Sequence, residues 1–341
     1  MRYKLLGKSG IRVSEICLGT MTFGEEWGWG AGKEESRRIF DAFVEKGGNF
    51  IDTANRYTEG TSEKYVGDFI ATDRERYVLA TKYSLFTRRD DVSASGNNRK
   101  SMVQSLEQSL ERLRTDYIDL YWVHAWDFMT PEEEVMRALE DMIRAGKILT
   151  IGVSDTPAWI VSRANTISEM RGWSQFVGLQ IEYSLTQRTV ERELTPLARS
   201  FDMAVLAWAP LAGGALTGKY LDSSDSTKRL NPLSARLNEK NTAIAREVVS
   251  IAGEIGCKPS SVAINWLRKQ SGVVIPLVGA RTVTQIEENL ECLNYDLAPE
   301  HITRLNEVSA IELGFPHDFF NKTKDIIFGG MVDSIDNHLV K

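Results

Sequence analysis

The chain is poor in the features that mark several large classes of protein. Its 341 residues include three cysteines, Cys17, Cys257 and Cys292, which are odd in number and far apart in the sequence. They form no Cys-x-x-Cys pair and no cluster with histidine, which argues against a metal site and favours a reducing cytoplasm. No apolar run approaches the length that crosses a membrane, and the first residues lack the apolar core of a signal peptide. We therefore expect a cytoplasmic protein without a membrane span.

An excess of positive charge is also missing. The formal net charge is −6, and no long basic run interrupts the sequence. This balance argues against nucleic acid or an anionic membrane as the main partner. The apolar share of 42% and the charged share of 26% are typical of a soluble globular protein. We find no internal repeat, low-complexity tract or interdomain linker, so we expect a single domain over residues 1–341. The sequence leaves homo-oligomer formation open.

What the chain does have is a regular alternation of short apolar stretches and helical patterns. Apolar residues recur at helical spacing, as in the face of Ile39, Phe40 and Phe43, which ends at Gly47. Strands separated by helices of this length pair in parallel, and eight such units favour a closed (β/α)8 barrel of the TIM type. The competing doubly wound sheet would carry a Gly-rich fingerprint after its first strand, and none is present. The predicted strands are 16–19, 49–52, 77–82, 117–123, 148–152, 176–180, 204–208 and 273–277.

Several segments depart from a minimal barrel. Residues 3–6 and 11–13 flank a Gly-containing turn and predict a hairpin that closes the N-terminal end of the barrel. The long, polar, Gly-rich segment 211–240 predicts a mobile loop over the catalytic face. Two extra helices, around 244–255 and 260–269, precede the last strand. We expect the tail after Leu313 to lie across the barrel mouth.

One helix start has a recognisable cap. Thr130, Pro131 and Glu133 form the pattern of a capping box with proline at the first helical position. The pattern predicts that Thr130 is the N-cap of the helix that follows.

Ionisable residues stand at or just past the ends of three of the predicted strands. Asp52 and Tyr57 follow the second strand, Lys82 ends the third and His124 follows the fourth. The carboxyl ends of parallel strands are where α/β proteins gather their chemistry. A carboxylate, a phenol, an ammonium and an imidazole at that face suggest a proton donor tuned by its neighbours. Taken singly, each has a plain structural reading: a turn former, a loop aromatic, a snorkelling strand end and a core or rim histidine.

Together these residues resemble a known family. The segment Asp52-Thr53-Ala54-x-x-Tyr57, with Lys82 and His124, is similar to the catalytic tetrad of the aldo-keto reductases. Further motifs at 18–21, 151–154, 209–211 and 275–281 occur in the family's order. The resemblance runs from about Lys4 to about Leu305. It implies a (β/α)8 barrel that reduces an aldehyde, ketone or aldose carbonyl by hydride transfer.

The resemblance also implies roles for the four residues. Tyr57 would be the general acid, and Lys82 would lower its pKa, which is about 10 for a free tyrosine. Asp52 would keep Lys82 charged and oriented, and His124 would donate to the substrate oxygen or orient it.

A coenzyme site follows from the resemblance, with NADP(H) preferred and NAD(H) as the alternative. Ser154 and Gln180 would bind the nicotinamide carboxamide, Trp208 would stack on the ring, and Arg281 would contact the 2′-phosphate. Without the family, Trp208 has the plain reading of a core residue and Arg281 that of a solvated surface charge. The residues implied to contact the coenzyme are Gly19, Thr20, Met21, Asp52, Ser154, Gln180, Trp208, Pro210, Leu211, Gly218, Lys219, Gly279, Arg281, Gln285 and Asn289.

Three positions depart from the commoner family pattern. Asp155 stands where an asparagine is usual, which puts one carboxamide hydrogen bond or its pH dependence in doubt. Ala209 replaces a frequent serine before Pro210. Leu277 occupies a place where some relatives carry lysine, so the sequence leaves recognition of the 2′-phosphate mainly to Arg281.

The sequence predicts less about the substrate pocket. The aromatic residues Trp27, Trp29, Tyr83, Phe86 and Trp126 fall in predicted loops after strands one, three and four. Aromatic walls suit aldehydes and sugar faces alike, and the loop with Trp27 and Trp29 has the alternative of packing on itself.

Two other functions compete with the reductase. The same motifs resemble potassium-channel β-subunits, which implies an NADPH-binding, redox-sensing regulatory subunit with slow turnover. A (β/α)8 enzyme that forms a Schiff base on Lys82 is the third option, but a nearby Asp52 would keep the amine charged and non-nucleophilic.

Overall fold

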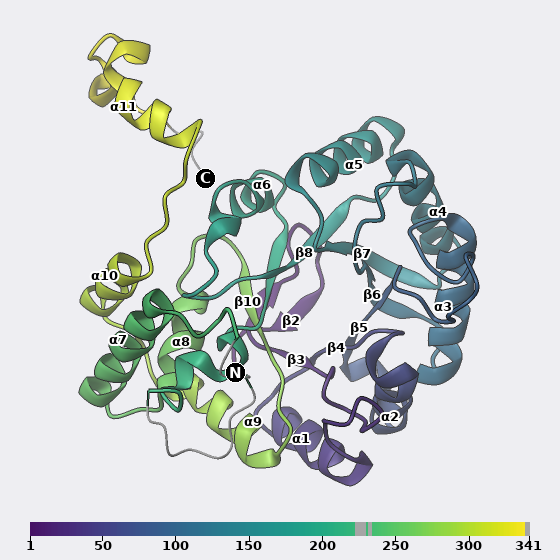
Figure 1. The fold of residues 1–341 in the computed structure, drawn as a ribbon. Helices are drawn as coiled ribbons and strands as arrows, with labels where there is room; N and C mark the ends of the chain where they lie inside the picture. The colour runs from purple at the N-terminus through teal and green to yellow at the C-terminus, as the bar shows by residue number, and fades with distance from the viewer. Residues whose placement is uncertain (222–229, 231–233, 338–341) are drawn as a thin grey trace.

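The centre of the molecule is a closed barrel of eight parallel strands (Figure 1). The computed structural model describes residues 1–221, 230 and 234–337. Around the barrel, the strands follow the order β10-β3-β4-β5-β6-β7-β8-β9, so each strand pairs with its neighbour in sequence and the last closes on the first. The predicted (β/α)8 barrel is confirmed. The strand bounds are β3 Cys17–Gly19, β4 Phe50–Asp52, β5 Val78–Tyr83, β6 Ile118–Val123, β7 Ile148–Ser154, β8 Phe176–Glu182, β9 Ala204–Trp208 and β10 Val274–Val278.

Helices surround the barrel in the order in which they follow the strands (Figure 1). Each buries an apolar face, as in α1, where Ile39, Phe40 and Phe43 are buried. Among the described residues, no helix combines the length and apolar character needed to cross a membrane. The helix bounds are α1 Lys33–Glu45, α2 Thr61–Ile70, α3 Arg99–Leu113, α4 Glu132–Arg144, α5 Ala158–Arg171, α6 Leu194–Ser200, α7 Glu239–Ile255, α8 Pro259–Arg268, α9 Val283–Leu290, α10 Pro299–Val308 and α11 His317–Phe328.

A hairpin closes the N-terminal end of the barrel, as predicted. Its strands are β1 Tyr3–Leu5 and β2 Arg12–Ser14, and it buries Leu6 and Val13 against the residues inside the barrel. Trp122 of β6 fills that interior and is fully buried. Gly152 on the neighbouring strand makes room for it, because an added Cβ would lie 2.3 Å from the Trp122 ring. The interior is therefore a packed core and not a channel.

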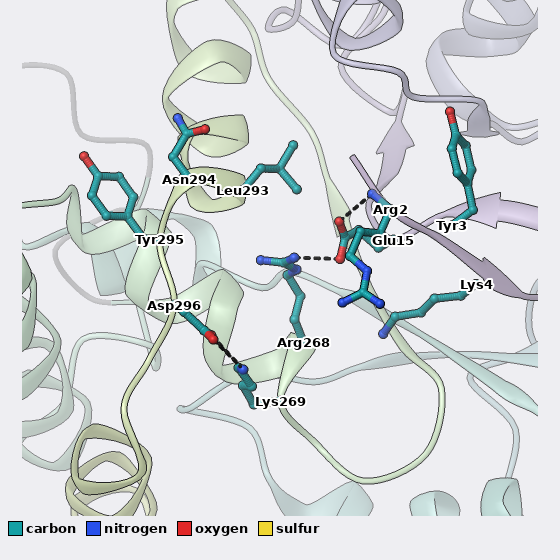
Figure 2. Close-up of a pocket in the computed structure, with 10 residues that line it drawn as sticks. All are labelled: Arg2, Tyr3, Lys4, Glu15, Arg268, Lys269, Leu293, Asn294, Tyr295 and Asp296. Carbon is teal, nitrogen blue, oxygen red and sulfur yellow. Dashed lines mark hydrogen bonds and ion pairs between the residues drawn. The ribbon is translucent and has the colours of Figure 1, made fainter.

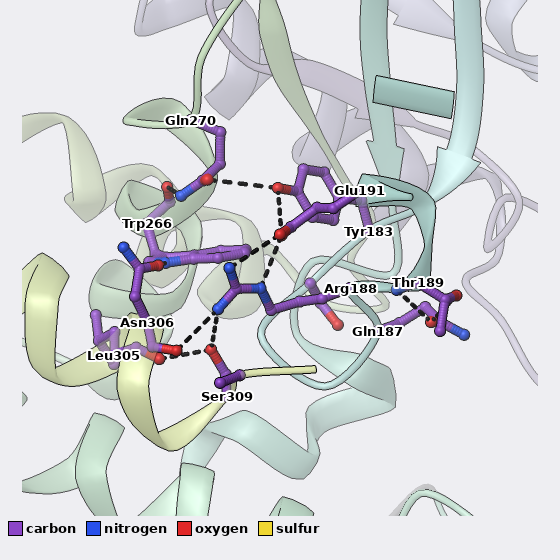
Figure 3. Close-up of polar contacts among 12 residues, drawn as sticks. Tyr183, Gln187, Arg188, Thr189, Glu191, Trp266, Gln270, Leu305, Asn306 and Ser309 are labelled. Carbon is purple, nitrogen blue, oxygen red and sulfur yellow. Dashed lines mark hydrogen bonds and ion pairs between the residues drawn. The ribbon is translucent and has the colours of Figure 1, made fainter. Parts of the chain in front are cut away.

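The extra helices near the C-terminus are fixed by a polar network around Arg188 (Figure 3). Its guanidinium forms a bidentate pair with Glu191 and donates to the carbonyl oxygen of Asn306 at 3.0 Å and to Ser309 Oγ at 2.8 Å. The same guanidinium lies 5.2 Å from the ring centroid of Trp266. Because Arg188 precedes the short helix η3, Thr189–Glu191, the network joins α10 to the segment after β8.

The tail beyond this network does not lie where the sequence suggested. We expected it to cross the barrel mouth, but α11 stands away from the barrel (Figure 1). None of its residues is buried. The weak apolar periodicity of this segment gave no sign of which surface, if any, it would pack on.

The expected cap of α4 is also wrong. Pro131, and not Thr130, is the N-cap, and no side chain caps the helix. The Thr130 hydroxyl instead donates to Asp127 Oδ2 at 2.8 Å, and its backbone N–H donates to Asp127 Oδ1. The aspartate three residues earlier competes for the threonine that the capping pattern assigned to the helix.

Candidate active site

Four ionisable side chains meet where β4, β5 and β6 end. Asp52 is the last residue of β4, Lys82 lies near the end of β5, and His124 follows β6. Tyr57 begins the short helix η1, Tyr57–Gly60. Because the strands are parallel and adjacent, their carboxyl ends open on the same face of the barrel. The structure thus brings together the residues that the strand ends singled out.

Lys82 is the centre of this cluster. Its ammonium donates to the Asp52 carboxylate, to the Thr53 carbonyl oxygen at 2.8 Å and to the Tyr57 hydroxyl at 2.9 Å. An ammonium has three N–H donors, so these contacts saturate it. The side chain is fully buried. Gln180 donates to the other oxygen of Asp52 at 2.9 Å, so the ion pair is held from both sides.

The charge state of Lys82 follows from these contacts. Burial alone lowers the pKa of Lys82, but the Asp52 carboxylate and Tyr57 outweigh it, and its pKa is raised. Burial raises the pKa of Asp52, and the Lys82 ammonium opposes that shift. The geometry therefore favours a charged ammonium. A charged amine is not a nucleophile, which argues against Schiff-base chemistry at Lys82.

The pKa of Tyr57 moves in the direction opposite to our expectation. We expected Lys82 to lower it below the usual value of tyrosine. Burial raises it instead, and the Lys82 ammonium offsets that effect only in part, while Asp52 adds to it. The removal of water from the phenol outweighs one ammonium that is already paired with a carboxylate. Tyr57 is therefore a protonated phenol whose oxygen accepts a hydrogen bond from a cation.

His124 stands at right angles to Tyr57. The ring centroids are 5.8 Å apart and the planes meet at 84°. Burial, and then the Lys82 ammonium, lowers the pKa of His124 well below its usual value. Within the described parts of the chain, its Nδ1 has no hydrogen-bond partner. A neutral imidazole keeps one N–H donor, so His124 can orient an oxygen atom without adding a charge.

A cavity of about 760 Å³ opens beside the cluster, and Asp52, Tyr57 and His124 form part of its wall. This volume is within the range of roughly 300–1,000 Å³ that is usual for small-molecule sites. In the described structure, no group of three His, Cys, Asp or Glu side chains is placed to hold a metal ion. The predicted coenzyme residues that line the cavity are Gly19, Met21, Asp52, Ser154, Gln180, Trp208, Pro210, Leu211, Lys219, Gly279, Arg281, Gln285 and Asn289.

Thr20 and Gly218 were also predicted to contact the coenzyme, but they are not among the residues that line the cavity in the described structure. Thr20 is buried, and its hydroxyl donates to the backbone oxygen of Asp52 at 2.9 Å. Gly218 has a φ of 82°, and an added Cβ would lie 2.7 Å from Val249 Cγ2. Thr20 joins the ends of β3 and β4, and Gly218 permits the turn that precedes Lys219.

One end of the cavity is formed by Trp208 and Asp155. The Trp208 indole N–H donates to Asp155 Oδ1 at 3.1 Å, so the tryptophan is a wall residue and not the plain core residue of the alternative reading. Asp155 is open to the cavity but enclosed by protein on its other sides. This enclosure raises the pKa of Asp155, and the Trp208 hydrogen bond partly opposes the shift. The unusual aspartate is thus an acceptor for the indole.

The opposite end lies at the start of α9. Thr282 is the N-cap of this helix, and its side chain accepts from the Gln285 N–H. Gln285 returns a contact, because its Oε1 accepts from the Arg281 N–H at 2.9 Å. A helix N-terminus beside a guanidinium is favourable for an anion.

The sequence prediction missed a second cation at this end. Lys258, which precedes Pro259 at the start of α8, also lines the cavity. Its ammonium lies 3.4 Å from Glu288 Oε1 on α9, and the lysine side chain is 55% exposed. The sequence does show a Lys-Pro pair at the start of a helix. It does not show that Lys258 lies near Arg281, because that depends on the packing of α8 beside α9. Positive charge at this end therefore comes from Lys258 as well as from Arg281, to which the sequence mainly pointed.

Part of the predicted loop over the catalytic face can be located. The segment after β9 forms the short helix η4, Ala212–Thr217, and Gly213, Gly214 and Arg236 join Lys219 in the cavity wall. Residues 222–229 and 231–233, which the prediction also included, lie outside the described residues.

None of the five aromatic residues suggested for the substrate pocket is among the described cavity residues. Tyr83 and Trp126 are buried, and the Tyr83 hydroxyl donates to the Asn97 carbonyl oxygen at 3.2 Å. Trp27 and Trp29 pack on each other with 5.8 Å between ring centroids, which supports the self-packed loop. Phe86 lies under the Arg56 guanidinium. These are structural contacts.

Comparison with known proteins identifies the family. The family model of the aldo/keto reductases matches residues 15–310. The norsolorinic acid reductase stcV of Emericella nidulans is 37% identical over 321 residues, which cover 91% of this chain and 82% of the relative. The NADP(+) aryl-alcohol dehydrogenase of Phanerodontia chrysosporium is 38% identical over 337 residues, which cover 93% and 88%. The chain therefore belongs to the aldo/keto reductase family and is an NAD(P)H-dependent oxidoreductase.

Proposed function

We propose that this protein uses NADPH to reduce an aldehyde, ketone or aldose carbonyl to the alcohol, and that Tyr57 donates the proton. The observation that carries the proposal is the hydrogen bond from the buried Lys82 ammonium to the Tyr57 hydroxyl, next to a cavity of suitable size. When bound, the coenzyme supplies the hydride that the carbonyl carbon accepts.

The role of Lys82 follows from the charge that appears during proton transfer. When the Tyr57 hydroxyl gives its proton to the developing alkoxide, a phenolate is left 2.9 Å from the ammonium. An ammonium already in place favours this charged product more than the neutral phenol, so its stabilisation grows as the reaction proceeds. Asp52 holds Lys82 in position, and neutral His124 donates to the substrate oxygen.

Coenzyme preference is proposed from the opposite end of the cavity. Arg281 and Lys258 supply two cations at the starts of α9 and α8, where a 2′-phosphate would be stabilised. A relative whose name includes NADP(+) supports the same preference. NAD(H) lacks this phosphate and remains the alternative coenzyme.

Replacing Tyr57 by phenylalanine tests the proposal. The variant should bind NADPH nearly as well as the wild type, while its turnover falls by about a hundredfold or more, as expected for loss of a general acid. The assay is loss of NADPH absorbance with a panel of aldehydes, ketones and sugars, and aryl aldehydes come first because one relative is an aryl-alcohol dehydrogenase. Wild-type turnover in the variant eliminates Tyr57 as proton donor. Tight NADPH binding with slow turnover on every compound would instead favour the regulatory subunit.

A further inference from the structure

We propose that the hairpin end of the barrel carries a second binding site, which takes a small anion bearing a phosphate dianion. A hollow of about 520 Å³ lies there, between the hairpin and the C-terminal end of α8 (Figure 2). The hollow is separate from the catalytic cavity. Lys4 in its wall donates to the carbonyl oxygen of Val274, at the start of β10, whereas the catalytic cavity lies at the carboxyl ends of the strands. Its charged wall residues are Arg2, Lys4, Glu15, Arg268, Lys269 and Asp296.

Both carboxylates in this wall are already engaged. Glu15 accepts from Arg268 Nη2 at 2.6 Å and, through its other oxygen, from the backbone N–H of Arg2 at 2.7 Å. Asp296 pairs with Lys269 at 2.7 Å. Figure 2 shows these contacts as dashed lines. Two cationic side chains, those of Arg2 and Lys4, are thus left over.

These two cations have no compensating charge of their own. Within the described residues, neither the Arg2 guanidinium nor the Lys4 ammonium forms an ion pair. Burial lowers the pKa of Lys4; Glu15 opposes that shift, and the Arg268 and Arg2 guanidinium groups add to it. The cations of Arg2, Lys4 and Arg268 therefore share the charge of Glu15, which is already paired with Arg268, in a protein whose formal net charge is −6.

The chemistry of the wall favours phosphate over a carboxylate. Guanidinium groups present paired N–H donors that match phosphate oxygens, and Arg2 and Arg268 both face the hollow (Figure 2). The charge of a dianion equals that of the two uncompensated cations. The hollow is also large enough for an organic group beyond the phosphate, because Leu293 and Tyr295 extend its wall.

Calorimetric titration with inorganic phosphate and with glycerol 3-phosphate tests the site. The test variant is R2Q/K4Q, which removes the two uncompensated cations. The matched control is K8Q/R12Q, which makes the same changes of charge on the same hairpin outside the hollow. A third variant, K258A/R281A, removes two cations from the catalytic cavity, where phosphate could also bind. Thermal melts of each variant without ligand show that it is folded.

We expect saturable binding in the wild type, in K8Q/R12Q and in K258A/R281A, and at least about tenfold weaker binding in R2Q/K4Q, as for loss of a charge-assisted contact. Tighter binding of the ester than of inorganic phosphate identifies an organic phosphate as the natural ligand, and equal binding identifies free phosphate. The proposal is overturned if no protein binds either probe saturably, or if K258A/R281A loses binding while R2Q/K4Q retains it. None of these outcomes depends on turnover, so the result is independent of the proposed reductase activity.

Discussion

Alanine substitution of the two cations at the far end of the cavity gives a quantitative test of coenzyme choice. Arg281 lies just before α9 and Lys258 just before α8, and NADPH differs from NADH only in the 2′-phosphate that we assign to them. The substitutions should therefore weaken NADPH binding and leave NADH binding nearly unchanged. Turnover at saturating NADPH should also change little, because neither residue is among the hydrogen-bond partners of Lys82 in the proton-donor cluster.

The two substitutions should differ in size. A charge-assisted hydrogen bond contributes about 1.5–3 kcal/mol, so R281A should weaken NADPH roughly ten- to a hundredfold. Lys258 is 55% exposed and already faces Glu288 at 3.4 Å. Exposed charge pairs contribute about 0.2–1 kcal/mol, so K258A should weaken NADPH by roughly two- to fivefold.

Fluorescence titration gives both dissociation constants for each variant. Lys269 provides a matched control, because it stands at the other end of α8, is similarly exposed and also forms an ion pair, with Asp296. K269A should leave both coenzymes unaffected. Equal weakening of NADPH and NADH by R281A would mean that Arg281 holds the loop or the pyrophosphate, and the assignment of the 2′-phosphate would be refuted. An unchanged NADPH constant in K258A would remove Lys258 from the site.

Three further predictions concern protonation and stability. K82M should lower turnover and move the alkaline limb of the pH–rate profile to higher pH, because Lys82 lowers the pKa of Tyr57 and the reaction needs a protonated phenol. If the alkaline limb does not move, Lys82 does not influence the group whose titration sets that limb. D155N should make NADPH affinity independent of pH. The wild type should bind NADPH more tightly as pH falls through the raised pKa of Asp155, because the protonated carboxyl becomes a hydrogen-bond donor, whereas the amide of asparagine is a donor at every pH. The same pH dependence in D155N and in the wild type would contradict this role of Asp155. R188A should lower the free energy of unfolding in urea by about 2–3 kcal/mol, because it breaks the contacts to Glu191, Asn306 and Ser309. The control R192A loses one contact to the Glu312 carbonyl oxygen and should stay within about 0.5 kcal/mol of the wild type.

Local patterns in the sequence were enough to predict the barrel and the cluster at its strand ends. Asp52, Lys82 and His124 each sit beside an apolar run, so their positions depend on strand length alone, and parallel pairing brings them together. The cap at Thr130 failed for a local reason, since Asp127 offers a nearer acceptor.

What the sequence could not supply was set by contacts between distant segments. Lys258 stands near Arg281 only because α8 packs beside α9. Tyr83 and Trp126 carry the composition of a binding loop, yet their burial is decided by neighbours elsewhere in the chain. The direction in which the pKa of Tyr57 is shifted also depends on contacts between distant segments. The sequence shows the lysine that lowers it, but not the enclosure that raises it further.

The contrast between two buried or partly buried lysines shows how the fold separates their uses. Lys82 has three oxygen partners, one of which is a carboxylate, and its pKa is raised. Lys4 has one carbonyl partner and guanidinium neighbours, and its pKa is lowered. The charge of Lys82 is compensated inside the protein, so it is available to stabilise a transient phenolate without needing a permanent counterion from outside. Lys4 shares the charge of Glu15 with the guanidinium groups, so an anion from solution would complete its compensation, as we propose for the hollow. We therefore propose that the same type of side chain takes part in the reaction at one end of the barrel and binds an anion at the other.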